Sequence, residues 1–275
     1  MHEEIKKGIN FIPVDSHRKL PKKILDSGLT IIPFGTDKSD IKIRDIMKDK
    51  IIPTHPSSVI FNGRSGSGKT QLMINLLCKP NFYGRDSDGK TYFDKVYMFS
   101  PTANLGDDLC KHIVAHGNLK KDDIYNEFDE TTLMSILKEQ EQKIKATGIA
   151  KSPKVLIVLD DIQSCPTFLR SKTVLKIFIQ NRHCNVSTWL CSQVFNKIPR
   201  ACRLQANNLF VFPCSRSEQD RMVEEFAPPK HTKFEFNQLI DYAHSDPHSF
   251  LHINMKDTPK TRFRKNLDEI LELKK

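Results

Sequence analysis

A glycine-rich loop between a predicted strand and a predicted helix is the feature that most constrains how this chain folds. The loop, residues 63–70, reads GRSGSGKT and fits the pattern G-x-x-x-x-G-K-[ST]. A short apolar run at residues 58–62 precedes it as a predicted buried strand, and residues 71–77 follow with apolar side chains at helical spacing. A glycine-rich turn that merely carries a lysine would lack these flanking elements. The pattern in this context therefore predicts a phosphate-binding loop.

Each residue type in the loop suits the binding of a phosphate chain. The glycines let the backbone bend tightly, so that its amides face the phosphates, and the following helix adds its positive N-terminal end. Lys69 supplies a charge for the β- and γ-phosphates, and the Thr70 hydroxyl can bind Mg²⁺. We expect a nucleotide to contact Gly63, Arg64, Ser65, Gly66, Ser67, Gly68, Lys69, Thr70 and Gln71.

Predicted strands alternate with predicted helices along most of the chain after this loop. The strands are expected at residues 94–101, 154–161, 186–193, 208–214 and 250–255. The helices are expected at residues 130–145, 166–180, 199–206, 217–226 (with Ser217 as N-cap) and 234–244. This alternation predicts an α/β fold with a doubly wound, mostly parallel sheet.

The remaining segments are predicted to be additions to one large domain. Residues 1–56 are expected to form an N-terminal arm that packs on the core or on a neighbouring subunit. Residues 57–256 are expected to form the phosphate-loop domain, and residues 257–275 a basic tail with a short amphipathic helix from Lys265 to Leu273. The N-terminal sequence MHEEIKKGIN has no apolar signal core, and no apolar run is long enough for a membrane span.

Net charge and cysteine content do not by themselves decide whether the chain binds nucleic acid or a metal ion. The net charge of +10 suits a polyanionic partner such as nucleic acid, although ordinary solubility is an equally good explanation. The seven cysteines include no C-x-x-C pair, which favours reduced, buried thiols in a cytosol-like compartment. Cys184 beside His183 hints at a metal site, but no second ligand pair at zinc spacing accompanies them.

Two acidic residues at the end of a fully apolar run form the second strong signal. Asp160 and Asp161 follow VLIVL at residues 155–159, which indicates a central parallel strand whose C-terminal end reaches the site. We expect Asp160 to hold the Mg²⁺ of a bound nucleotide. Asp161 is expected to orient and deprotonate the attacking water, because hydrolysis needs a base within hydrogen-bond reach of that water.

Polar residues around the next predicted strand complete the candidate site. Gln193 ends this strand, and in a doubly wound sheet a neighbouring strand tip brings such a side chain near the γ-phosphate. Three arginines, Arg182, Arg200 and Arg203, flank or follow the strand. Any of them could stabilise the charge of a transferred phosphoryl group, in the same subunit or from a neighbour.

Four segments in order, GRSGSGKT, VLIVLDD, NRHCNVSTWLCSQ and IPRACRLQANNLFVF, resemble the genome-packaging ATPases of large double-stranded DNA viruses. These are poxvirus-type enzymes of the FtsK–HerA superfamily, found also in virophages and Maverick-type elements, and the resemblance covers about residues 55–255. It implies a RecA-like (ASCE) P-loop fold, ATP and Mg²⁺ as cofactors, and a ring of identical subunits. It also implies double-stranded DNA and capsid or portal-vertex proteins as partners, in the host cytoplasm, the viral factory or the virion.

The resemblance also assigns roles to residues. It implies that Lys69 and Thr70 bind nucleotide, that Asp160 is the magnesium acid and that Asp161 is the catalytic acid, with Gln193 as sensor. Of the three arginines it makes Arg203 the first candidate for an arginine finger that acts on the ATP of a neighbouring subunit. The wider superfamily often has glutamate where this chain has the shorter Asp161.

Two other functions use the same loop and remain open at this point. A small-molecule kinase would need an acceptor pocket and a lid, and the adjacent Asp160 and Asp161 together with Gln193 argue against it. A nucleotide-dependent assembly protein would bind capsid or DNA and change shape without turnover. DNA-stimulated ATP hydrolysis separates these alternatives from a packaging motor.

Overall fold

Strands from distant parts of the chain form a single sheet. The computed structural model describes residues 9–12, 51–103 and 108–273, and all structural statements refer to these residues. The strands are β1 (Ile9–Ile12), β2 (Ser58–Asn62), β3 (Lys95–Phe99), β4 (Leu119–Tyr125), β5 (Val155–Asp160), β6 (Val186–Ser192), β7 (Asn208–Val211), β8 (Leu251–Asn254), β9 (Phe263–Lys265) and β10 (Glu269–Leu273). They lie in the order β1-β10-β9-β8-β7-β2-β6-β5-β3-β4.

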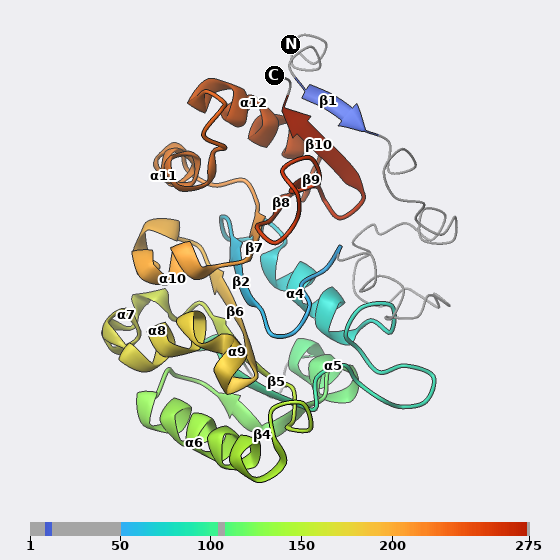
Figure 1. The fold of residues 1–275 in the computed structure, drawn as a ribbon, viewed down its shortest axis with the longest axis vertical. Coiled ribbons are helices and arrows are strands. Elements are labelled where there is room, and N and C mark those ends of the chain that lie inside the picture. Colours follow the sequence, from blue (N-terminus) through green and yellow to red (C-terminus); the bar gives the residue numbers. More distant parts are fainter. Residues whose placement is uncertain (1–8, 13–50, 104–107, 274–275) are drawn as a thin grey trace.

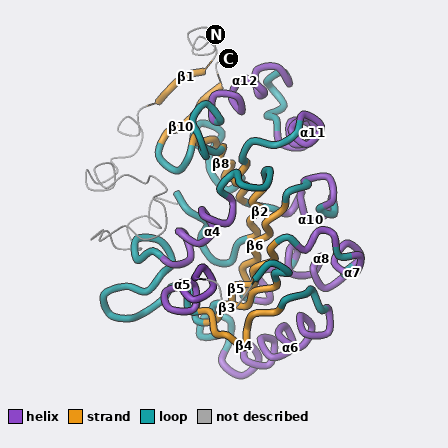
Figure 2. The backbone as a smooth tube through the Cα atoms, turned by 180° about the vertical axis from the view of Figure 1, so that it is seen from behind, coloured by secondary structure: helices purple, strands orange, loops and turns teal. Residues whose placement is uncertain are grey.

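Helices cover both faces of this sheet, as Figures 1 and 2 show from opposite sides. One face carries α4 (Lys69–Cys78) and α5 (Asp108–His116). The other carries α6 (Glu130–Thr147), α7 (Pro166–Arg170), α8 (Lys172–Ile179), α9 (Asn181–Cys184), α10 (Arg200–Gln205), α11 (Arg216–Phe226) and α12 (Lys233–Ala243). Two short 3₁₀ turns, η2 (Ile162–Ser164) and η3 (Phe195–Lys197), follow β5 and β6.

The central strands are apolar on both faces because each face packs under helices. Along β2, Val59 and Phe61 belong to the core beneath α4, whereas Ile60 between them belongs to the core on the opposite face. Every residue of β5 is buried. Such strands read as continuous apolar runs and are typical of parallel sheets. The predicted α/β fold with a doubly wound, mostly parallel sheet is confirmed.

The sheet has a parallel part and an antiparallel part. β7, β2, β6, β5, β3 and β4 pair in parallel, and β8, β9, β10 and β1 extend the sheet from β7 by antiparallel pairing. At the other end β4 is the edge strand, and three consecutive residues in it, Lys120, Lys121 and Asp122, are exposed.

Several helices differ from the sequence-based expectation. The predicted helix at 166–180 is two helices, because Ser171 interrupts it and caps α8 by accepting a hydrogen bond from the Val174 amide. Ser217 is not an N-cap: α11 begins at Arg216, and its N-cap is Ser215, which makes no side-chain capping bond. The helix α5 and the edge strand β4 were not expected, since residues 102–129 show little apolar periodicity.

The predicted C-terminal helix is wrong. The segment from Lys265 to Leu273 instead completes a hairpin of β9 and β10, with Asn266 in the left-handed conformation (φ 55°) at the turn. Leu267, Ile270 and Leu271 stand at helical spacing, yet Leu271 and Leu273 pack under α12 from a strand. An isolated nine-residue helix is marginal in water, whereas the edge of β8 offers backbone hydrogen-bond partners.

Most of the predicted N-terminal arm, residues 1–8 and 13–50, lies outside the described residues. Within the arm, β1 pairs antiparallel with β10, and Ile51 and Ile52 are buried in the core beneath α4. None of the helices among the described residues has the length and apolarity that a membrane crossing requires.

Candidate functional site

The phosphate-binding loop lies where the parallel strands end. Gly63 directly follows β2, and a side-chain Cβ at this position would stand 2.5 Å from the Phe212 Cβ, so the loop passes too close for any larger residue. Gly68 has φ 108°, a conformation that favours glycine, and it precedes the first residue of α4. The predicted strand, loop and helix are thus all present around residues 63–70.

Lys69 stands inside the curve of this loop. Its Nζ donates hydrogen bonds to the carbonyl oxygens of Gly63 and Arg64, each at 2.8 Å. Burial lowers the pKa of Lys69, and the nearby Asp161 and Asp160 oppose that change. The buried Ser67 hydroxyl and Gln71 amide nitrogen have no hydrogen-bond partner within the described residues. The loop and the first turn of α4 therefore present the Lys69 cation together with two donors, on Ser67 and Gln71, that have no acceptor among the described residues. This arrangement suits an anion.

Asp160, the last residue of β5, lies at the same edge of the sheet. It is 5% exposed, and the Ser100 hydroxyl at the end of β3 donates to its Oδ2 at 3.2 Å. Burial, and then the charge of Asp161, raise the pKa of Asp160 to about 6, against the opposing effect of Lys69. A bound divalent cation would offset this accumulated negative charge.

Asp161 is held between two amides. Its Oδ2 accepts from Gln193 Nε2 at 2.8 Å, and its Oδ1 accepts from Gln163 Nε2 at 3.2 Å. Its backbone has φ 52°, uncommon for a residue other than glycine, and its amide bonds to the Cys191 carbonyl of β6 at 3.2 Å. Both carboxylate oxygens thus face donors, and the side chain has a fixed direction.

The parallel register explains why these residues meet. β2 and β6 pair Asn62 with Ser192, and β5 and β6 pair Asp160 with Cys191, so the three strands end together. Lys69, Asp160, Asp161 and Gln193 therefore converge at one edge, as the sequence predicted. Gln163 was not predicted, because a glutamine two residues beyond the acidic pair carries no recognisable pattern.

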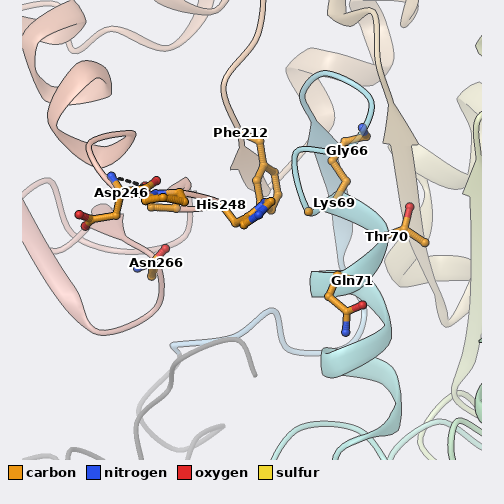
Figure 3. A pocket seen from close by; sticks show the side chains of 11 residues that line it. Gly66, Lys69, Thr70, Gln71, Phe212, Asp246, His248 and Asn266 are labelled. Carbon is orange, nitrogen blue, oxygen red and sulfur yellow. Dashed lines mark hydrogen bonds between the residues drawn. The ribbon is translucent and has the colours of Figure 1, made fainter. Parts of the chain in front are cut away.

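A cavity of about 640 Å³ adjoins the loop beside the first turn of α4. Thr70 and Gln71 project from that turn, and Phe212 and His248 lie side by side between the loop and the segment that carries Asp246 (Figure 3). A Cβ built on Gly68 would contact both rings, at 3.3 Å from Phe212 Cε1 and 3.8 Å from His248 Nδ1.

Residues far along the chain form the outer wall of this cavity. His248 has φ 60°, and its Nδ1 lies 3.4 Å from the Ser67 carbonyl oxygen. Asn266, at the β9–β10 turn, accepts the Phe250 amide through Oδ1 at 3.2 Å. Sequence reasoning missed Asn266 because it placed residues 265–273 in a helix, and it missed His248 because it assigned no structure to residues 245–249. A histidine with positive φ beside a phosphate loop is strained, and strain of this kind clusters at functional sites.

The predicted role of Arg203 is contradicted by its surroundings. The side chain is buried, and its Nε and Nη2 donate to the two carboxylate oxygens of Glu225 at 2.8 and 2.6 Å. Nη1 donates to the Ile198 carbonyl at 2.5 Å, and the guanidinium lies 5.1 Å from the Phe195 ring centre. Each of its three nitrogens donates to a partner within the protomer, so Arg203 is not available to a neighbouring subunit.

The other two candidate arginines are exposed. The Arg200 side chain is 73% exposed, and its Nε lies 3.9 Å from a Glu225 carboxylate oxygen. Arg182 lies at the opposite edge of the sheet, just before β6, and makes no ion pair with any described residue. Cys184 is buried, and the described residues include no group of three or more His, Cys, Asp and Glu side chains that could hold a metal ion.

Comparisons with known proteins agree with this geometry. The model of the family described as Poxvirus A32 protein matches residues 46–240. No curated protein sequence matches the chain. Among solved structures, the genome packaging NTPase B204 from Sulfolobus turreted icosahedral virus 2 in complex with AMP superposes with a TM-score of 0.51 at 12% identity. That match covers 78% of this chain and 98% of B204.

The same NTPase in complex with ATP-gammaS gives a TM-score of 0.50 at 12% identity, with 72% of this chain and 92% of that chain covered. At this identity the likeness establishes a shared fold. The phosphate loop, the acidic end of β5 and the fold therefore all indicate a nucleotide-binding site.

Proposed function

Since this chain belongs to the poxvirus A32 protein family, we propose that it is an ATP-hydrolysing motor that packages double-stranded DNA into a preformed capsid. The convergence of Lys69, Asp160, Asp161 and Gln193 at one sheet edge carries this proposal. The fold shared with B204, a genome packaging NTPase described in complex with AMP and with ATP-gammaS, supports it.

The nucleotide would occupy both the loop and the adjoining cavity. Phosphate oxygens would replace the Gly63 and Arg64 carbonyls as partners of Lys69, and would give the buried donors of Ser67 and Gln71 the acceptors that they lack. The nucleoside would extend along the first turn of α4 into the cavity beside Phe212. The aromatic lining suits a base and the polar rim suits a ribose.

The residues present fit a magnesium ion. Asp160 and the Thr70 hydroxyl supply hard oxygen ligands, and nucleotide phosphates and water commonly complete such a site. The ion would supply charge neutralisation on the β- and γ-phosphates. Ser100 would hold the Asp160 carboxylate in place through the hydrogen bond already present.

Asp161 is suited to act as the general base. Its carboxylate would accept a proton from a water that attacks the γ-phosphorus, while the bond from that phosphorus to the β-bridging oxygen breaks and ADP leaves. Gln163 and Gln193 would fix the direction of the carboxylate. The Gln193 amide contacts Asp161 and directly follows the strand beside the phosphate loop, which supports a role as sensor of the γ-phosphate.

In a ring of subunits, a cation from the neighbouring subunit would complete the nucleotide site. Arg203 is committed to Glu225, so we assign this role to Arg200, the exposed arginine at the start of the same helix. Such a finger stabilises charge on the transferred phosphoryl group. Capsid or portal-vertex proteins would be the further partners of a ring at the packaging vertex, and its place would be the site of virus assembly.

ATP turnover by the purified chain, with and without duplex DNA, tests the proposed function. We expect turnover that DNA stimulates, and no turnover in Lys69→Ala, because the loop loses its only lysine. Circular dichroism checks that the variant is folded. Turnover that requires a small-molecule acceptor would identify a kinase, and tight ATP binding without turnover would identify an assembly switch. Either result would overturn the proposal.

A further inference from the structure

The edge of the sheet where the parallel strands begin carries a groove of about 440 Å³. It lies opposite the phosphate loop, because its lining comes from residues that precede β6 and β7 and from residues that follow the antiparallel β8. Arg182, His183 and Lys256 contribute its basic side chains. Three of its apolar residues, Ile179, Leu204 and Met255, are 51%, 46% and 36% exposed.

The cations of this edge lie within electrostatic reach of one another. Burial, and then the charge of Arg182, lower the pKa of Lys256. Lys154 and Lys256 both act on His55, whose pKa is lowered to about 4 chiefly by burial, so this imidazole is neutral near pH 7. Arg182 and Lys256 line the groove and Lys154 lies near it, so the three form a group of positive charges, which we call the basic edge.

The carboxylates near the basic edge have other partners: Glu225, which also lines the groove, pairs with Arg203, and Asp94 accepts the backbone amide of Lys154 at 2.7 Å. Within the ranges that the structure describes, Lys154, Lys256 and Arg182 form no ion pair; the Lys256 Nζ donates to the Pro56 carbonyl at 3.2 Å, and the Lys154 Nζ lies 4.5 Å from the Tyr92 ring centre. By contrast, Lys176 on the outer helical face lies 2.6 Å from Glu141. Gathered like charges cost free energy, and a bound anion would offset this cost.

We propose that the basic edge binds the phosphate backbone of duplex DNA. This inference rests on the proposed function and names the surface that its DNA substrate uses. A duplex presents regularly spaced phosphates, which grouped lysine and arginine side chains can contact without regard to sequence, as a translocating motor requires. Exposed Ile, Leu and Met side chains beside such cations also occur on proteins that pack against the minor groove.

Strand β6 links this surface directly to the nucleotide site. Arg182 lies in α9, four residues before the first residue of β6, and Gln193 directly follows its last. DNA bound at the basic edge would therefore contact an element whose other end carries the amide that holds Asp161. This connection gives a physical basis for expecting that occupancy of the groove changes ATP turnover.

Binding of a fluorescent duplex to the full chain, measured by anisotropy over a series of salt concentrations without nucleotide, tests the proposal. Arg182→Glu/Lys256→Glu should lower affinity at least tenfold and reduce the slope of log affinity against log salt by about two. The matched control is Lys138→Glu/Lys145→Glu on α6, which changes net charge equally at exposed positions away from the groove. It should change affinity much less.

Arg182→Gln serves as a milder variant in case the double substitution does not fold. Basal ATP turnover without DNA should be unchanged in all these variants, and DNA stimulation should be lost in the groove variants only. Equal losses of affinity in groove and control variants would show that net charge alone matters, and would overturn the proposal.

Unchanged DNA affinity with altered sedimentation would make the groove a contact between protein subunits, and would also overturn the proposal. A loss of basal turnover in Arg182→Gln with unchanged DNA affinity would place Arg182 at a neighbour's nucleotide instead. If the parent chain bound DNA at the basic edge but hydrolysed no ATP, the proposed function would fail while this inference stood.

Discussion

The parallel part of the sheet and its antiparallel extension contribute different kinds of side chain to the nucleotide site. The parallel part supplies Lys69, Asp160 and Asp161, which are charged and fixed by hydrogen bonds at strand ends. The extension supplies His248 and Asn266, which form an outer wall of the cavity. We therefore propose that the first region carries out the chemistry and that the second adjusts affinity for the nucleoside.

The largest effect should come from Asp161→Asn, in the parallel part. The amide keeps the shape but cannot accept the proton from water, so turnover should fall by about 10²–10⁴-fold while ATP still binds. Single-turnover hydrolysis together with equilibrium binding of labelled ATP measures the two effects separately. If the variant hydrolyses ATP at the parent rate, the base lies elsewhere.

Asp160→Asn should change how stability depends on pH. The pKa of Asp160 is raised from 3.8 to about 6 in the folded protein, so between these values the folded protein binds a proton that the unfolded chain has lost. Stability of the parent should therefore fall as pH rises from about 4 to 6, by about 3 kcal/mol, and Asp160→Asn should lack this loss.

Urea unfolding of the nucleotide-free protein at several pH values between 4 and 7 checks this prediction. Asp94→Asn, which replaces an exposed aspartate at the opposite edge of the sheet, is the matched control. Parallel pH curves for the parent and Asp160→Asn would show that Asp160 titrates normally.

Gln163→Leu should lower the maximal rate by roughly tenfold, because one of the two donors that hold Asp161 is lost. KM for ATP should stay the same. In Gln163→Glu a second carboxylate faces Asp161, so the acidic limb of the pH–rate profile should move to higher pH. A merely structural role for Gln163 would lower the rate in both variants without moving the profile.

The smallest effect should come from His248→Ala, in the antiparallel part. KM for ATP should rise roughly fivefold with little change in the maximal rate, because the cavity loses a wall but the loop and acids stay in place. Inhibition by tripolyphosphate, which has no nucleoside, should be unaffected. His183→Ala, an exposed histidine at the opposite edge, is the control. An equal loss of tripolyphosphate inhibition would contradict the division between the two regions.

The same division separates what the sequence predicted from what it did not. The phosphate loop and the acidic pair follow from local patterns, since a glycine-rich turn and a continuous apolar run each specify their own structure. The wall formed by His248 and Asn266 depends on pairing between β8, β9 and β10, and the residues of β10 fit helical spacing equally well. Local periodicity does not decide between a helix and a strand in this segment, whereas the available edge of β8 favours the strand.

Arg203 shows a second limit of sequence reasoning. Its position after β6 and Gln193 favoured a role in catalysis. Its partner, Glu225, lies 22 residues further on and in another helix. A bidentate pair of this kind has no signature in the sequence. Only the packing of α11 against η3 and α10 brings the two charges together inside the protomer.

The exposed charges of β4 have a consequence for how copies of this chain behave when they are crowded together. An unpaired edge strand is a template on which another chain can add a strand, and such addition continues without limit. Lys120, Lys121 and Asp122 make that addition unfavourable along the middle of β4, because incoming backbone would have to displace their water. Open-ended, filament-like stacking of copies through this edge is thereby disfavoured.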